Sequence, residues 1–106
     1  MRVLLTNLPP LLRDILTETL AGESDMSVVG GGVRGDAESL IGQLSPDVVL
    51  IQASRDEAER LFRAFGSVVV AIDPRADRAL VFRDSEPVML RDVSPTSIVM
   101  AIRGTA

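Results

Sequence analysis

The sequence predicts a single α/β domain built around a mostly parallel sheet. Short apolar runs alternate with longer segments in which apolar residues recur every three or four positions, the pattern of βαβ units. The runs at 48–51 and 68–72 are apolar at every position, as expected for strands buried on both faces of a parallel sheet. A chain of 106 residues with 46% hydrophobic residues can form one core, so we expect one domain over residues 1–106.

The first half of the chain predicts two strands, each followed by a helix. Residues 3–5 are the first strand, and apolar residues recur at helical spacing over 11–20. Two prolines precede that helix and a glycine follows it, which suits its start and its end. Residues 28–29 form a short second strand, and Asp36 can cap a second helix that ends before Pro46.

The second half continues the alternation. Residues 48–51 are the third and central strand, and apolar residues at i, i+3, i+4 and i+7 over 58–65 predict the third helix. Residues 68–72 and 88–90 are the fourth and fifth strands, both rich in residues that favour strands. Ser94, followed by a proline, is placed to cap the last helix.

The segment 73–86 stays open between helix and strand. A doubly wound sheet requires a helix here, but the apolar run 79–82 is short and could instead form a hairpin with the fifth strand. In either case the fourth helix region is compressed.

Composition narrows the classes of function. The chain has no Cys and no His, so it lacks thiolates, the commonest metal ligand and the commonest general base. We therefore expect no enzyme, no cofactor and no metal site. The net charge of -4, the scattered arginines and the absence of Trp and Tyr predict no direct nucleic-acid binding. Without a signal-like start or a membrane-length apolar run, a cytoplasmic protein with no membrane partner is expected.

Several stretches, by their order and spacing, resemble the receiver domain of two-component response regulators. They are Arg2-Val3-Leu4-Leu5, Pro10-Leu11-Leu12-Arg13, Val28-Val29-Gly30, the run from Ser45 to Ile51, the run from Leu90 to Pro95, and Ala101-Ile102-Arg103. The resemblance covers nearly the whole chain and implies a flavodoxin-like, doubly wound sheet of five mostly parallel strands in the order 2-1-3-4-5. It is strongest to the branch that usually has a helix-turn-helix output domain, which would lie outside this chain.

The positions that perform phosphoryl transfer in that family are changed here. The resemblance implies an acidic pair after the first strand, a phosphate-accepting aspartate after the third, a hydroxyl after the fourth and a lysine after the fifth. The corresponding residues are Asn7, Leu8, Gln52, Ile72 and Arg91. An amide cannot accept a phosphoryl group, and no carboxylate remains here to hold Mg²⁺. We therefore expect a non-phosphorylatable pseudo-receiver in which Arg91 is the one retained charge.

Such a domain is expected to act through its surfaces, as a signalling or regulatory module that binds a protein partner or forms a homodimer. The family commonly uses its fourth helix, fifth strand and last helix for this purpose, and an exposed edge strand within 79–90 could pair with another chain. The candidate interface residues are Val81, Arg83, Val88, Arg91, Asp92, Ser94 and Ile98.

Two alternatives remain open. One is a small-ligand or nucleotide-binding domain that uses the crevice at the carboxyl ends of the strands. Its expected residues are Asn7, Gln52, Asp73 and Arg91. Glycines within 30–35 match a dinucleotide-binding pattern, but Gln52 stands where an acid would bind the ribose, and Asp36 would repel a pyrophosphate. The other alternative is an intact receiver with a displaced acceptor.

Overall fold

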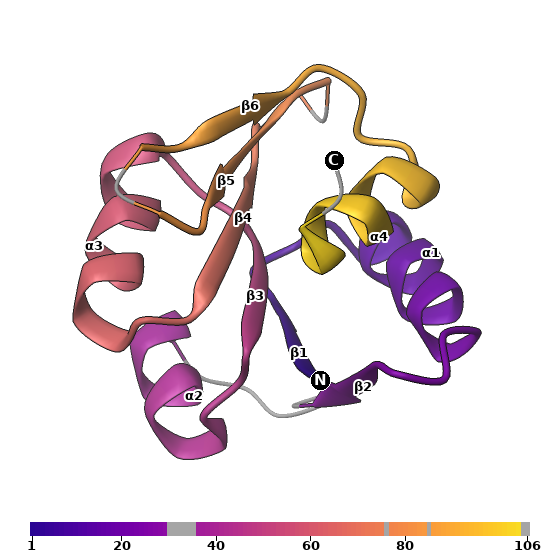
Figure 1. Ribbon diagram of the computed structural model, residues 1–106, viewed down its shortest axis with the longest axis horizontal. Helices are drawn as coiled ribbons and strands as arrows, with labels where there is room; N and C mark the ends of the chain where they lie inside the picture. The colour runs from indigo at the N-terminus through magenta and orange to yellow at the C-terminus, as the bar shows by residue number, and fades with distance from the viewer. Residues whose placement is uncertain (30–35, 76, 85, 105–106) are drawn as a thin grey trace.

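The computed structural model describes residues 1–29, 36–75, 77–84 and 86–104 (Figure 1). The strands are β1 (Arg2–Thr6), β2 (Ser27–Val29), β3 (Val48–Gln52), β4 (Val68–Ile72), β5 (Ala79–Phe82) and β6 (Val88–Leu90). The helices are α1 (Pro10–Ala21), α2 (Ala37–Leu44), α3 (Arg55–Phe65) and α4 (Pro95–Arg103). These elements confirm the α/β class.

The strands form one mixed sheet in the order β2-β1-β3-β4-β5-β6. β1, β2, β3 and β4 are parallel to one another, β5 is antiparallel to β4, and β6 is antiparallel to β5. Figure 1 shows α1 and α4 on one face of the sheet and α2 and α3 on the other. Among the described residues, no helix is both long enough and apolar enough to cross a membrane.

Local signals for the helix ends agree with the structure. The Asp36 carboxylate accepts a hydrogen bond of 2.7 Å from the backbone N–H of Ser39 and caps α2. The Ser94 hydroxyl caps α4 in the same way by accepting from the N–H of Ser97. Gly66 ends α3 with a φ of 76°, a left-handed conformation that costs glycine little. These caps confirm the predicted starts of α2 and α4 and the end of α3.

The core has two layers, one on each face of the sheet. Along β3, Val48 and Leu50 pack into the layer under α1 and α4, and Val49 and Ile51 pack into the layer under α2 and α3. This alternation confirms that residues 48–51 are buried on both faces.

Residues 79–82 form a strand, and this strand corrects the predicted sheet. The prediction of five strands is wrong, because β5 pairs antiparallel with β4 and occupies the place expected for residues 88–90. Residues 88–90 pair with β5 instead and become the sheet edge. The reason is the short connection after β4, in which the N–H of Asp73 donates to the Arg78 carbonyl at 3.0 Å. This turn leaves no length for a helix, so the described part of the segment holds a strand only.

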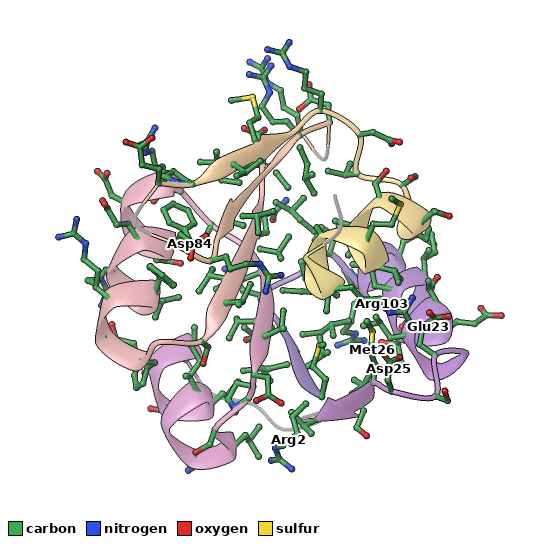
Figure 2. All side chains as sticks on the ribbon, in the orientation of Figure 1. Arg2, Glu23, Asp25, Met26, Asp84 and Arg103 are labelled. Atoms are coloured by element: carbon green, nitrogen blue, oxygen red, sulfur yellow. The ribbon has the colours of Figure 1, made fainter. Side chains whose placement is uncertain are left out.

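An ion-pair network that local sequence does not predict joins α4 to the loop between α1 and β2 (Figure 2). The Arg103 guanidinium donates to Glu23 Oε1 at 2.6 Å and to Asp25 Oδ1 at 2.8 Å. The N-terminal amine of Met1 donates to the Asp25 carbonyl at 2.9 Å. The hydrogen bond from Arg103 is the main cause that lowers the pKa of Asp25. The network therefore links the N-terminus and α4 to one loop.

Replacing Asp25 with asparagine should make the stability of the protein less dependent on acid pH. Because the pKa of Asp25 lies below its usual 3.8 in the folded protein, its charge stabilises the fold above pH 3.8 and loses that effect as the pH falls through the lowered pKa. D25N should therefore melt slightly below the wild type near neutral pH, because exposed ion pairs contribute little stability, and the two melting temperatures should converge in acid. D14N is the control, since Asp14 is exposed and only loosely paired with Arg13, at 3.9 Å. A constant gap between D25N and wild type at every pH would contradict this.

Candidate functional site

The carboxyl ends of β1, β3 and β4 lie side by side at one end of the sheet, where side-chain amides link the loops that follow them. Asn7 Nδ2 donates to the Gln52 carbonyl at 3.1 Å, and Gln52 Nε2 donates to the Pro74 carbonyl at 3.3 Å. Asn7 has a φ of 54°, a conformation that asparagine adopts more readily than most residues. The structure thus brings Asn7 and Gln52 together, and both amides connect the loops that follow the strands.

The two apolar residues of the predicted site belong to the core. Ile72 is buried in the layer under α1 and α4, and Leu8 packs against the same layer. The nearby carboxylate of Asp73 accepts a hydrogen bond of 2.8 Å from the N–H of Arg75, within its own loop. In the part of the chain that the structure describes, no three acidic, His or Cys side chains gather in a way that could hold a metal ion.

Arg91 does not join the other residues of the predicted phosphorylation site. It follows β6, which lies three strand intervals from β3 in the sheet, a distance of about 14 Å. Arg91 instead borders an opening of about 320 Å³ together with Asp77, Arg78 and Met89. The inserted β5 is the reason, because it places β6, and with it Arg91, further from Gln52 in the sheet.

Two of the predicted interface residues are buried, which corrects their assignment. Val81 is 6% exposed and Ile98 is 0% exposed, and both pack in the layer under α1 and α4. Alternation along β5 turns Val81 toward α4, and Ile98 lies on the inner face of that helix. Neither side chain offers a surface to a partner.

Three other predicted interface residues hold α4 in place. Arg83 Nη2 donates to the carbonyls of Ala101 and Ile102 at 2.6 and 2.9 Å, at the carboxyl end of the helix. At the other end, Asp92 accepts a hydrogen bond of 3.0 Å from the N–H of Ser94. This bond is the largest cause that lowers the pKa of Asp92. These side chains satisfy both ends of the helix.

Strand β6 is the part of the predicted interface that is exposed. Val88 is 57% exposed and Met89 is 48% exposed. Their partners on β5, Val81 and Leu80, belong to opposite core layers. The edge strand therefore presents an apolar side chain on each face of the sheet. Met89 was not among the predicted interface residues, although alternation with Val88 was the signal that could have identified it.

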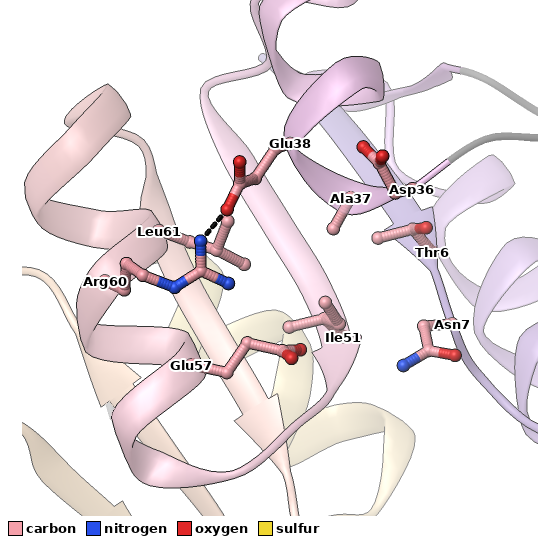
Figure 3. A pocket seen from close by; sticks show the side chains of 9 residues that line it. All are labelled: Thr6, Asn7, Asp36, Ala37, Glu38, Ile51, Glu57, Arg60 and Leu61. Atoms are coloured by element: carbon pink, nitrogen blue, oxygen red, sulfur yellow. Dashed lines mark ion pairs between the residues drawn. The ribbon is translucent and has the colours of Figure 1, made fainter.

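A cleft of about 470 Å³ opens beside the carboxyl ends of β1 and β3, between α2 and α3 (Figure 3). Its lining residues are Thr6, Asn7, Asp36, Ala37, Glu38, Ile51, Glu57, Arg60 and Leu61. Ile51 and Leu61 are buried and form an apolar wall, and Arg60 forms an ion pair with Glu38. The cleft shares only Asn7 with the predicted ligand crevice, because the side chains of Gln52 and Asp73 are hydrogen-bonded to the backbone of the loop after β4. The glycine pattern within 30–35 lies outside the described residues.

Incubation of the protein with Mg²⁺ and a small-molecule phosphodonor should give no mass increase. The Gln52 side chain is a neutral amide, and among the described residues no group of three acidic side chains lies near it to hold the metal. Q52D should also remain unmodified, since one carboxylate does not replace the acidic pair. Intact-mass spectrometry measures the result. A receiver domain that has the acidic pair and the phosphate-accepting aspartate, treated in parallel, shows that the phosphodonor is active. A gain of one phosphoryl group by the wild type would show that a displaced acceptor exists.

Comparison of the chain with protein-family models, with curated proteins and with solved structures gave no match. The function proposed below therefore follows from the residues and their geometry.

Proposed function

We propose that this chain is a cytoplasmic, receiver-like interaction module that does not take up phosphate and that acts in signalling or regulation through strand β6. The single observation that carries the proposal is an apolar edge strand, with Val88 and Met89 exposed on its two faces. The parallel order β2-β1-β3-β4 supports the flavodoxin-like part of the proposal. The amide links of Asn7 and Gln52 support the absence of phosphoryl chemistry.

An edge strand can bind another strand because one row of its backbone N–H and C=O groups has no partner in the sheet. Proteins that avoid such pairing shorten the edge or flank it with charges and proline. β6 spans only Val88–Leu90 and follows Pro87, which limits the number of residues that can pair with another strand. The exposed Val88 and Met89 favour pairing along this short stretch. Because few residues pair, the expected contact is specific but weak.

The occupant that we propose is a second copy of this chain. Acidic residues Asp84 and Glu86 precede β6, whereas Arg91 follows it. The neighbouring charges of Arg83 and Asp92 are hydrogen-bonded at the two ends of α4. In an antiparallel pair with Val88 opposite Val88 of the second copy, the basic end of each edge meets the acidic end of the other. The same register keeps each face of the two sheets continuous, because paired residues of antiparallel strands point to one side. The edge is thus complementary to itself in charge and in the faces to which its side chains point.

Sedimentation velocity over a range of concentrations tests this function. The wild type should shift from monomer toward dimer in the high micromolar to millimolar range, and V88D should remain monomeric because it places like charges opposite each other at the two-fold axis. L11D is the matched control, since Leu11 is 74% exposed on α1, far from the edge in sequence and fold. Melting curves should show that V88D and L11D are both folded.

Charge exchange makes the test specific for the proposed register. R91E should weaken the dimer, and the double variant E86R/R91E should restore it, because the opposite ends then carry exchanged charges. A wild type that stays monomeric at millimolar concentration, or a dimer that V88D leaves intact, would exclude the second copy as the occupant.

A further inference from the structure

The cleft between α2 and α3 has the position and the chemistry of a ligand site, and it is independent of the β6 edge. We infer that this cleft binds a small organic cation, a primary alkylammonium. Glu57 is the main hydrogen-bond acceptor for the ammonium group, and the alkyl chain packs against the apolar wall of Ile51 and Leu61. Figure 3 shows the Glu57 side chain extending toward Ile51 in the cleft.

The position follows from the chain path. β1 and β3 are neighbours in the sheet, and the chain leaves β1 through α1 on one face and reaches β3 through α2 on the other. Strands whose connecting helices lie on opposite faces leave a crevice at their carboxyl ends, which is where open α/β sheets bind ligands. Thr6 and Asn7 at the end of β1, and Ile51 near the end of β3, line this crevice.

The size and the apolar part of the cleft suit a small organic molecule. Its volume of about 470 Å³ falls within the range of roughly 300–1,000 Å³ that is usual for such sites. Ile51 and Leu61 are almost completely buried, and Ala37 is partly buried. These side chains can cover a short run of methylene groups.

The charged residues that line the cleft determine which sign of charge the ligand carries. Three carboxylates line it, those of Asp36, Glu38 and Glu57, and the one guanidinium, that of Arg60, is paired with Glu38. Two negative charges are therefore left without a positive partner among the lining residues. The N–H of Ser39 lowers the pKa of Asp36 and keeps that carboxylate charged. A phosphate or nucleotide would be repelled, whereas a cation is attracted.

Glu57 is the residue best placed to recognise an ammonium group. It is half-buried, and within the described residues its carboxylate forms no hydrogen bond or ion pair. Its position beside the apolar wall reduces solvent screening, which strengthens attraction to a cation. An ammonium group has three N–H donors, and the Thr6 hydroxyl in the same lining is a further acceptor for a ligand in the cleft.

Titration with 1,4-diaminobutane, followed by NMR of the backbone amides, tests this inference. Saturable shifts should appear at Thr6, Ile51 and Leu61, and 1,4-butanediol, which has the same length without charge, should cause none. E57Q should weaken binding about tenfold or more. E59Q is the control, because Glu59 lies on the same helix but pairs with Arg63 outside the cleft.

E57Q and E59Q lower the net negative charge equally, so equal weakening by both variants would show only non-specific attraction and would overturn the inference. The absence of saturable shifts at tens of millimolar diamine, or binding of ATP in its place, would overturn it as well. E38Q provides a second variant, which should also weaken binding because it releases the positive charge of Arg60. V88D should bind the diamine like the wild type, so this site and the β6 contact can fail separately.

Discussion

The hydrogen bond from the Asp73 N–H to the Arg78 carbonyl closes the turn that sends β5 back along β4. A parallel neighbour for β4 would need a crossover connection of a dozen or more residues, and the chain between β4 and β5 is far too short for one. The turn therefore makes the last two strands antiparallel to their neighbours. It also moves β6 to the sheet edge, where Val88 and Met89 remain exposed, and it separates Arg91 from Gln52.

The same turn explains why the strand ends can use amides. Gln52 Nε2 donates to the Pro74 carbonyl in this turn, and Asn7 Nδ2 donates to the backbone of Gln52. An aspartate or glutamate at either position would have no N–H to donate at neutral pH. The amides therefore serve to hold three loops at fixed positions. This arrangement fixes the strand ends beside the cleft without a carboxylate at position 7 or 52, and carboxylates are the ligands that Mg²⁺ sites use.

Features set by neighbouring residues could be predicted from the sequence, and features set by distant contacts could not. Asp36, Ser94 and Gly66 act on the turn of helix beside them, so their residue types were sufficient. Residues 79–82 fit a helix or a strand equally, and only pairing with β4 decides between them. Arg103 binds Asp25 across 78 positions of sequence, which no local pattern reveals. For the same reason the cleft, formed by side chains from β1, β3, α2 and α3, could be placed only approximately.

The cleft and the β6 edge are connected through α3 and β5, and this connection determines whether they can influence each other. α3 contributes Glu57 to the cleft, and its Phe62 ring lies 6.2 Å from the ring of Phe82 on β5. Coupling between two sites requires an element with two arrangements. α3 is capped at its start by Ser54 and at its end by Gly66, and its inner residues Ala58 and Leu61 are buried. These constraints favour one position of α3, so we expect a cation in the cleft to leave β5 and the edge unchanged, and the two proposed sites to be independent of each other.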